Sequence, residues 1–177
     1  KQFGLGLEAA GSFATEPPNF PNACHVCEVE VNPETGAVAI DRYTIVDDVG
    51  RALNPMICEG QLHGGLAQGI GQALWEHVVY DRQSGQLLSG TFGDYCMPRA
   101  DDFSAFTVAL EEVPCTTNPL GVKGLGEVGS VGAPPAVVNA ILDALRPLGV
   151  DHVDMPATPA RVRERVQQAR PAAAARA

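Results

Sequence analysis

A glycine-rich stretch in the first half of the chain constrains the fold more than any other feature. Apolar residues recur about every fourth position over 57–74, the period of an α-helix, and Asn54-Pro55 is a pair that can cap and start one. Five glycines interrupt this pattern, namely Gly60, Gly64, Gly65, Gly69 and Gly71. Each glycine costs a helix about 1 kcal/mol relative to alanine. We therefore expect another backbone or a ligand to come very close to this helix.

The other segments alternate between strand and helix patterns. A β-hairpin is expected over 26–46, with its turn in the sequence NPETG, and a second hairpin over 77–90. A further strand is expected over 106–114. One helix is expected from Pro134, with Pro134 and Pro135 in its first turn, and a last helix after a Thr158 N-cap. The pattern predicts an α+β fold, in which β-hairpins and small mixed sheets pack with about three helices.

The length of the chain indicates one domain. Its 177 residues are 45% hydrophobic, which is enough for one compact core. We assign residues 1–168 to this domain and expect residues 169–177, which are mostly alanine, to form a disordered tail. The chain begins with Lys1 in mid-pattern, so we expect it to be an excised domain or a split subunit of something larger.

The charge and the cysteines exclude several classes of protein. Twelve basic residues against 21 acidic ones give a net charge of −9, which argues against a nucleic-acid partner. We find no basic cluster suited to a membrane surface and no transmembrane helix. Five scattered cysteines favour a reducing compartment, hence a cytoplasmic protein, over a disulfide framework. Neither the cysteines nor the four histidines have metal-ligand spacing, so no metal ligands are predicted and each histidine is treated as structural or exposed.

A single carboxylate, Glu127, lies among glycines just ahead of a predicted helix. The glycines on both sides let another molecule approach the backbone, and the positive end of the helix favours an ionised carboxylate. Such a group suits a general base, which must lie within hydrogen-bond reach of the proton it removes. The spacing alone leaves a plainer interpretation open, in which Glu127 only caps the helix.

Two other groups of polar residues are candidates for binding. Gln61 and Gln68 are seven residues apart, so they lie on one helical face, and Gln72 follows one turn later. Their amides can hold a large polar cofactor, or they can be solvated side chains on a tightly packed helix. The acidic residues near Asp101 and Asp102 can bind a cation, although a solvated loop is the plainer interpretation.

The order of these segments resembles a known family. The sequences GRALNPMICEGQLHGGLAQGIGQALWE, YCMPRADDF, NPLGVKGLGEVGSVGAPPAVVNAILDAL and HVDMPATPARV follow one another. In this order they resemble the C-terminal part of the large, molybdenum-binding subunit of the xanthine dehydrogenase, aldehyde oxidase and carbon monoxide dehydrogenase family. The resemblance covers about residues 26–166, and its most specific elements are 60–71 and 124–127. It implies that residues 1–168 form a molybdopterin-binding domain.

The resemblance also implies a chemistry. A pterin, expected in its cytosine dinucleotide form, holds the molybdenum in such enzymes, so no protein metal ligand is needed. Glu127 then corresponds to the general base toward a molybdenum-bound hydroxyl during oxidative hydroxylation of an aldehyde, an N-heterocycle or a similar carbon centre. Gln61 corresponds to a glutamine that contacts the cofactor, and Lys123, Gly126 and Gln68 are assigned to the cofactor side by the same match.

The resemblance further implies partners outside this chain. These are the remainder of the molybdenum subunit, iron–sulfur and flavin subunits carrying 2Fe-2S clusters and FAD, and a small-molecule substrate. We expect this chain to be inactive on its own, because much of the pterin and substrate site lies elsewhere in the family. The alternative is a non-catalytic assembly module, in which the glycines serve only packing and the acidic surface docks partner subunits.

Overall fold

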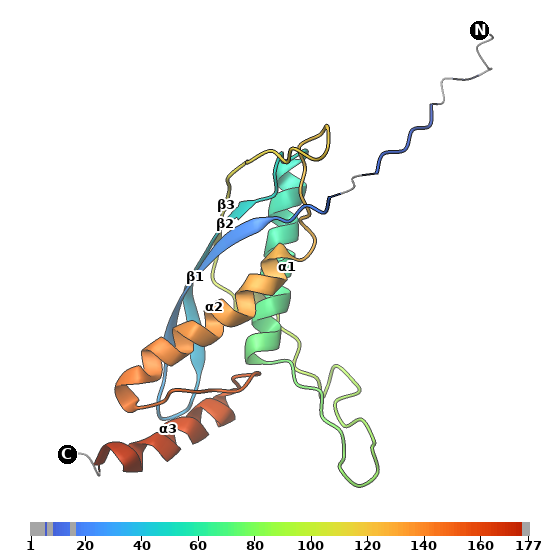
Figure 1. Ribbon diagram of the computed structural model, residues 1–177. Coiled ribbons are helices and arrows are strands. Elements are labelled where there is room, and N and C mark those ends of the chain that lie inside the picture. The colour runs from blue at the N-terminus through green and yellow to red at the C-terminus, as the bar shows by residue number, and fades with distance from the viewer. Residues whose placement is uncertain (1–5, 7–8, 15–16, 175–177) are drawn as a thin grey trace.

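The computed structural model describes residue 6 and residues 9–14 and 17–174 (Figure 1). The strands are β1 (Asn22–Val31), β2 (Val38–Asp48) and β3 (Phe106–Leu110). The α-helices are α1 (Pro55–Leu74), α2 (Val128–Leu145) and α3 (Pro159–Ala174), and two short 3₁₀ helices span Ala100–Asp102 and Arg146–Leu148. These elements confirm the predicted α+β fold.

The sheet is mixed, with β2 as its central strand. β1 and β2 are antiparallel, and the predicted turn joins them, because the Asn32 side chain accepts the N–H groups of Glu34 and Thr35 and Gly36 has a positive φ. β3 runs parallel to β2, from the pair Tyr43–Phe106 to the pair Asp47–Leu110. A parallel pair needs a long crossover, which α1 and the segment after it supply. The sequence pattern indicated the β3 strand but not its partner.

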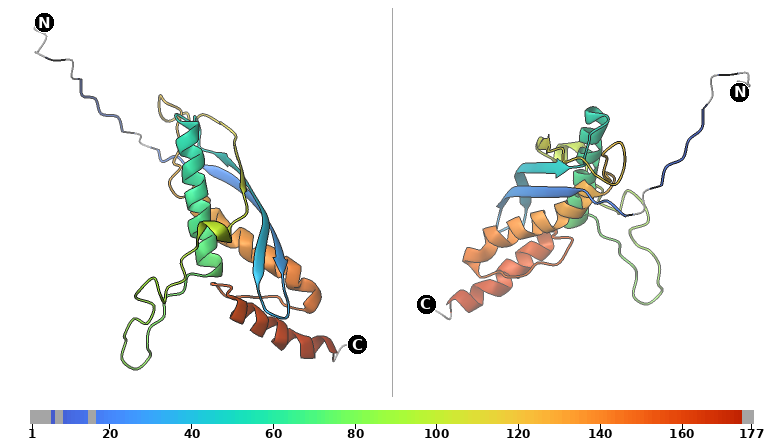
Figure 2. Two further views of the ribbon diagram at one scale, coloured as in Figure 1. Left: turned by 180° about the vertical axis from the view of Figure 1, so that it is seen from behind. Right: turned by 45° about the horizontal axis from the view of Figure 1, so that its top comes forward.

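The core lies between the sheet and two crossing helices, α1 and α2 (Figures 1 and 2). The inward side chains of β2 alternate along the strand, and Tyr43, Ile45 and Asp47 are fully buried. The helices contribute the buried side chains Leu62, Leu66, Ile70, Val137, Ile141 and Leu145. Burial of each such aliphatic side chain stabilises the fold by about 1.5–3 kcal/mol.

The glycines of α1 explain how closely α2 approaches. A Cβ on Gly65 would lie 3.0 Å from the Cα of Gly129, and a Cβ on Gly69 would lie 2.7 Å from the Cβ of Ala133. The close backbone predicted from the glycine pattern is therefore that of α2. Gly60 and Gly64 differ, because a Cβ at either position would meet nothing within 4 Å. These two exposed glycines are not needed for packing among the described residues.

The start of α2 corrects the prediction. The helix begins at Val128, six residues before Pro134, and both prolines lie inside it. Their missing N–H groups remove two intrahelical hydrogen bonds. The first turns persist because Gly129, Ala133 and Pro134 are buried against α1, so tertiary packing outweighs the local cost. Because proline is typical of the first turn of a helix, the sequence predicted a start at Pro134 and not at Val128.

The α2 segment also meets the length and composition of a membrane span. Residues 128–148 have a mean hydropathy of 1.4 over an 18-residue window, although no transmembrane helix was predicted from the sequence. In this fold α2 contacts α1 and β1 and supplies part of the core. An apolar core helix meets the same two criteria.

The second predicted hairpin forms only in part. Residues 76–99 leave the body as an extended arm (Figure 1), in which one bridge pairs Tyr80 with Leu87. Asp81 closes the turn by accepting the N–H groups of Gln83 and Ser84. Regular strands are not formed in this arm, because no second sheet lies beside it within the described chain.

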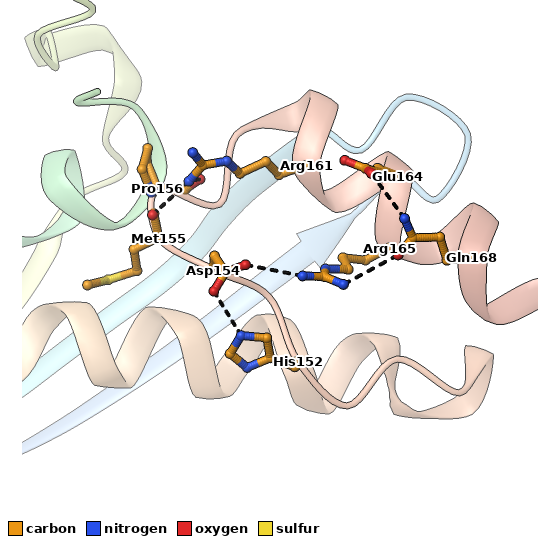
Figure 3. Close-up of polar contacts among 8 residues, drawn as sticks. All are labelled: His152, Asp154, Met155, Pro156, Arg161, Glu164, Arg165 and Gln168. Atoms are coloured by element: carbon orange, nitrogen blue, oxygen red, sulfur yellow. Dashed lines mark hydrogen bonds and ion pairs between the residues drawn. The ribbon is translucent and has the colours of Figure 1, made fainter. Parts of the chain in front are cut away.

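The segment before α3, residues 151–158, attaches the last helix to α1. The N–H of Ala157 donates to the carbonyl of Ala73 near the end of α1. Arg161 of α3 donates to the carbonyls of Met155 and Pro156 in this segment (Figure 3). Asp154 accepts from His152 and Arg165. The helix itself runs to Ala174, so it continues into the segment predicted to be a disordered tail, while residues 175–177 lie outside the described part.

Candidate functional site

Glu127 lies at the head of α2 and faces a cavity. It is the N-cap residue of α2, but its side chain makes no capping hydrogen bond, so the plainer interpretation as a cap is not supported. Its backbone carbonyl accepts the N–H of Val131 and the hydroxyl of Ser130, which fixes its main chain. The carboxylate is exposed and lines a cavity of about 540 Å³.

The cavity is lined by open glycines and by apolar side chains. Gly124 and Gly126 lie next to Glu127 in the chain, and a Cβ on either glycine would meet nothing closer than 3.9 Å. Phe20 and Val131 also line the cavity, and both are largely exposed in this chain. The open glycines allow a bulky group to reach the backbone next to the carboxylate.

Gln61 is brought to the same place from a distant part of the sequence. Its Nε2 donates a 2.8 Å hydrogen bond to the carbonyl of Gly126, across 65 residues. This bond joins α1 to the loop just before Glu127. The structure therefore brings together three of the predicted site residues, Gln61, Gly126 and Glu127.

Lys123 is held on the other side of the loop. Its Nζ pairs with Asp48 Oδ2 at the end of β2, and the two side chains are only 11% and 14% exposed. Lys123 lines a second cavity, of about 300 Å³, together with Ile57 and Leu125. Burial opposes ionisation of Asp48, but hydrogen bonds from Lys123, Gly50 and Val113 outweigh it and hold the pKa of Asp48 below its usual range.

Gln68 lies farther along α1 and does not line the cavity of Glu127 among the described residues. It is exposed, two turns after Gln61, on the face that also carries the open glycine Gly64. This face of α1 is polar and has little steric bulk. Its role toward a cofactor stays a prediction.

Another residue of this cavity, His25, was not predicted from the sequence as a site residue. Its Nδ1 lies 2.8 Å from the hydroxyl of the buried Tyr43, and burial lowers the pKa of His25. Its Nε2 is buried without a hydrogen-bond partner among the described residues. The ring fits against α2 only because position 132 is glycine, where a Cβ would lie 2.3 Å from Nε2. A lone histidine on a strand does not reveal such surroundings.

A buried carboxyl group, Asp47, lies beside this site in β2. It is fully buried, and neither carboxylate oxygen has a hydrogen-bond partner among the described residues. Burial, and next the charge of Asp48, raise the pKa of Asp47 to about 6. The folded protein therefore binds a proton that the unfolded chain releases at the ordinary pKa of 3.8. Stability must fall as the pH rises from about 3.8 to about 6.

We expect Asp47→Asn to abolish this pH dependence. Below pH 4 the variant gains little over the parent, and at pH 7 it gains up to about 3 kcal/mol, at 1.36 kcal/mol per pKa unit. The measurement is urea unfolding of both proteins at pH 4 and pH 7, with Asp41→Asn, an exposed site on the same strand, as control. A gain for Asp47→Asn that is equal at both pH values contradicts the assignment.

Comparison with known proteins identifies the family. The sequence family described as "Molybdopterin cofactor-binding domain" matches residues 2–104, more than half of the chain. The chain belongs to this family. The match includes Gln61 and Gln68, whereas Lys123, Gly126 and Glu127 lie beyond it. The predicted resemblance to molybdenum-binding large subunits is thereby confirmed.

Individual relatives of this molybdopterin-binding domain agree. It is 42% identical over 160 residues to the nicotine 6-hydroxylase large subunit of Paenarthrobacter nicotinovorans, covering 90% of this chain and 20% of that one. It is 38% identical over 159 residues to the carbon monoxide dehydrogenase large chain of Hydrogenophaga pseudoflava, covering 89% and 19%. The structure of a Cu,Mo-containing CO dehydrogenase superposes with a TM-score of 0.81 at 33% identity, covering 84% and 19%. The chain spans about a fifth of the length of these relatives.

The residues present fit a pterin that carries its own metal. The described chain contains no group of three His, Cys, Asp or Glu side chains that could hold a metal ion. It offers instead a cavity with open glycines and an adjoining amide at Gln61. Neutral amides and accessible backbone suit a large polar cofactor whose metal is ligated by the cofactor itself.

Proposed function

We propose that this domain is a component of a molybdenum hydroxylase and that Glu127 is its general base. The observation that carries the proposal is the position of Glu127, whose carboxylate makes no capping hydrogen bond and lines a cavity of about 540 Å³ next to the open glycines Gly124 and Gly126. The hydrogen bond from Gln61 to Gly126 fixes the backbone beside it. A base acts well only when it is held in place, so a fastened loop supports the role.

The proposed chemistry divides between cofactor and protein. When bound, the molybdenum pterin supplies the redox step in which an electrophilic carbon of the substrate gains oxygen. Glu127 accepts a proton at a carboxylate oxygen and thereby activates the attacking group. Phe20 and Val131 add apolar side chains to the cavity that the carboxylate lines. The substrate is an aldehyde, an N-heterocycle or a similar carbon centre.

The proposed cofactor contacts are Gln61, Gly126, Lys123 and Gln68. Gln61 and Gly126 form the edge of the cofactor site next to Glu127, supported by their mutual hydrogen bond. Lys123 and Gln68 are proposed contacts on the strength of the family resemblance. The cofactor is proposed to be the cytosine dinucleotide form of molybdopterin.

The proposed enzyme is larger than this domain. Its other parts are the remainder of the molybdenum subunit and iron–sulfur and flavin subunits with 2Fe-2S clusters and FAD, in a cytoplasmic complex. The large subunits named among the relatives support this proposal, because the present chain matches about a fifth of each.

Analysis of the purified complete complex tests the cofactor proposal. We expect about one molybdenum atom per large subunit, together with cytidine monophosphate after acid hydrolysis of the pterin. The absence of molybdenum from a fully assembled complex favours the non-catalytic assembly module instead. The proposed role of Glu127 is tested separately, by the turnover of a Glu127→Gln variant.

A further inference from the structure

The loop that carries Glu127 contains little regular structure of its own. It includes Gly121, Gly124 and Gly126, and fixing the backbone of one residue costs about 1–2 kcal/mol, more for glycine. A misplacement of about 1 Å in a reacting group can lower a rate about 10²-fold. A base at the end of such a loop therefore needs strong contacts elsewhere that hold the loop in one conformation.

Backbone hydrogen bonds attach this loop to the end of β2. The N–H of Arg51 donates to the carbonyl of Gly121, and the N–H of Lys123 donates to the carbonyl of Val49, at 2.9 and 2.8 Å. They flank an isolated bridge between Gly50 and Val122. The approach is close, because a Cβ on Gly50 would lie 2.2 Å from the carbonyl oxygen of Gly121.

Asp48 is the side chain at the centre of this attachment. Its Oδ1 accepts the N–H of Gly50 at 2.9 Å and the N–H of Val113 at 3.1 Å, and its Oδ2 accepts from the Lys123 ammonium. One carboxylate thus joins the end of β2, the segment after β3 and the loop before Glu127. Hydrogen bonds to an ionised acceptor are about twice as strong as neutral ones.

The pair is also largely removed from water, with side-chain exposures of 14% for Asp48 and 11% for Lys123. A shielded pair is worth more than a surface pair, and loss of one partner leaves an uncompensated charge. An exposed pair in the same sheet provides a comparison. Glu28 Oε1 and Arg42 Nη1 lie 3.4 Å apart, and the two side chains are 51% and 63% exposed.

We propose that Asp48 is a positioning residue for catalysis, which holds the Glu127 loop in its active conformation through Lys123. This inference rests on the proposed role of Glu127 as base. Asp48 itself does not line the Glu127 cavity, so it acts through the loop and not on the substrate. Lys123 lies four residues before Glu127, and Gln61 fixes the intervening Gly126 from the α1 side.

The test uses Asp48→Asn in the complete complex, with Glu28→Gln as the matched control. The asparagine keeps an oxygen for the two N–H groups but loses the charge that pairs with Lys123. We expect turnover to fall about 10²-fold while molybdenum content stays unchanged. Amide hydrogen exchange over 121–127 is expected to accelerate about tenfold or more, and Glu28→Gln is expected to change neither quantity.

A double variant controls for the possibility that Asp48→Asn fails to fold because the charge of Lys123 is left unpaired. Asp48→Asn combined with Lys123→Met removes both charges, so no buried charge is left unpaired, and we expect its stability in urea to return toward that of the parent while exchange over 121–127 stays accelerated. Unchanged exchange over 121–127 in Asp48→Asn overturns the proposal. So does faster exchange with full turnover, provided that Glu127→Gln is inactive. An active Glu127→Gln variant overturns the base assignment instead, while the exchange data still show whether Asp48 holds the loop.

Discussion

Replacing Glu127 with Gln is expected to lower turnover of the complete molybdenum enzyme by about 10²–10⁴-fold. Glutamine keeps the length and shape of the side chain but cannot accept a proton at neutral pH. Glu127 makes no capping hydrogen bond and is exposed in this chain, so little of the fold depends on its charge. The loss should therefore concern the chemical step alone.

The measurements for this variant must separate chemistry from assembly. Steady-state turnover is compared with molybdenum content and with the thermal unfolding temperature, and the last two are expected to match the parent. Glu112→Gln, an exposed carboxylate outside the cavity of Glu127, is the control and should keep full turnover. Parental turnover in Glu127→Gln, at full molybdenum content, contradicts the assignment of Glu127 as base.

Local signals in the sequence were sufficient for the elements that depend on neighbouring residues. The β1–β2 hairpin follows from alternation and from Asn32 in its turn, and the start of α1 follows from Asn54, whose side chain accepts the N–H of Ile57. The parallel partner of β3 could not be predicted, because its pairing joins residues some 60 positions apart. The beginning of α2 was hidden by prolines that only the packing against α1 explains.

For the candidate site as well, residues identified by their sequence neighbours could be predicted, and residues that depend on distant contacts could not. Glu127 and Gly126 could be identified as candidate site residues from the sequence, because both lie in one short glycine-rich segment next to a predicted helix. Asp48 could not be identified from the sequence, because its partner Lys123 is 75 residues away along the chain. The sequence likewise does not show which glycines pack against a neighbouring helix and which are open to solvent. Gly65 and Gly129 pack helices, whereas Gly64 and Gly126 are open, and only the position of α2 decides which is which.

Alanine substitutions at two of these glycines, Gly129 and Gly64, are expected to have opposite effects on stability. A Cβ at Gly129 would lie 2.9 Å from the carbonyl oxygen of Leu62 and 2.9 Å from the backbone nitrogen of Leu66. Backbone atoms cannot rotate away as side chains can, so α1 and α2 must separate. We expect Gly129→Ala to destabilise the chain by about 3 kcal/mol, the upper range for overpacking.

Gly64→Ala is the matched control on the facing helix. Its Cβ would meet nothing within 4 Å, so only the helix propensity changes, and alanine should stabilise the chain by up to about 1 kcal/mol. The two variants should thus differ by about 4 kcal/mol in urea unfolding, with Gly129→Ala melting about 6–12 °C below the parent. Equal stabilities would mean that α1 and α2 do not cross in backbone contact. Since α2 begins directly after Glu127, such a result would also remove the physical basis for the position of the base.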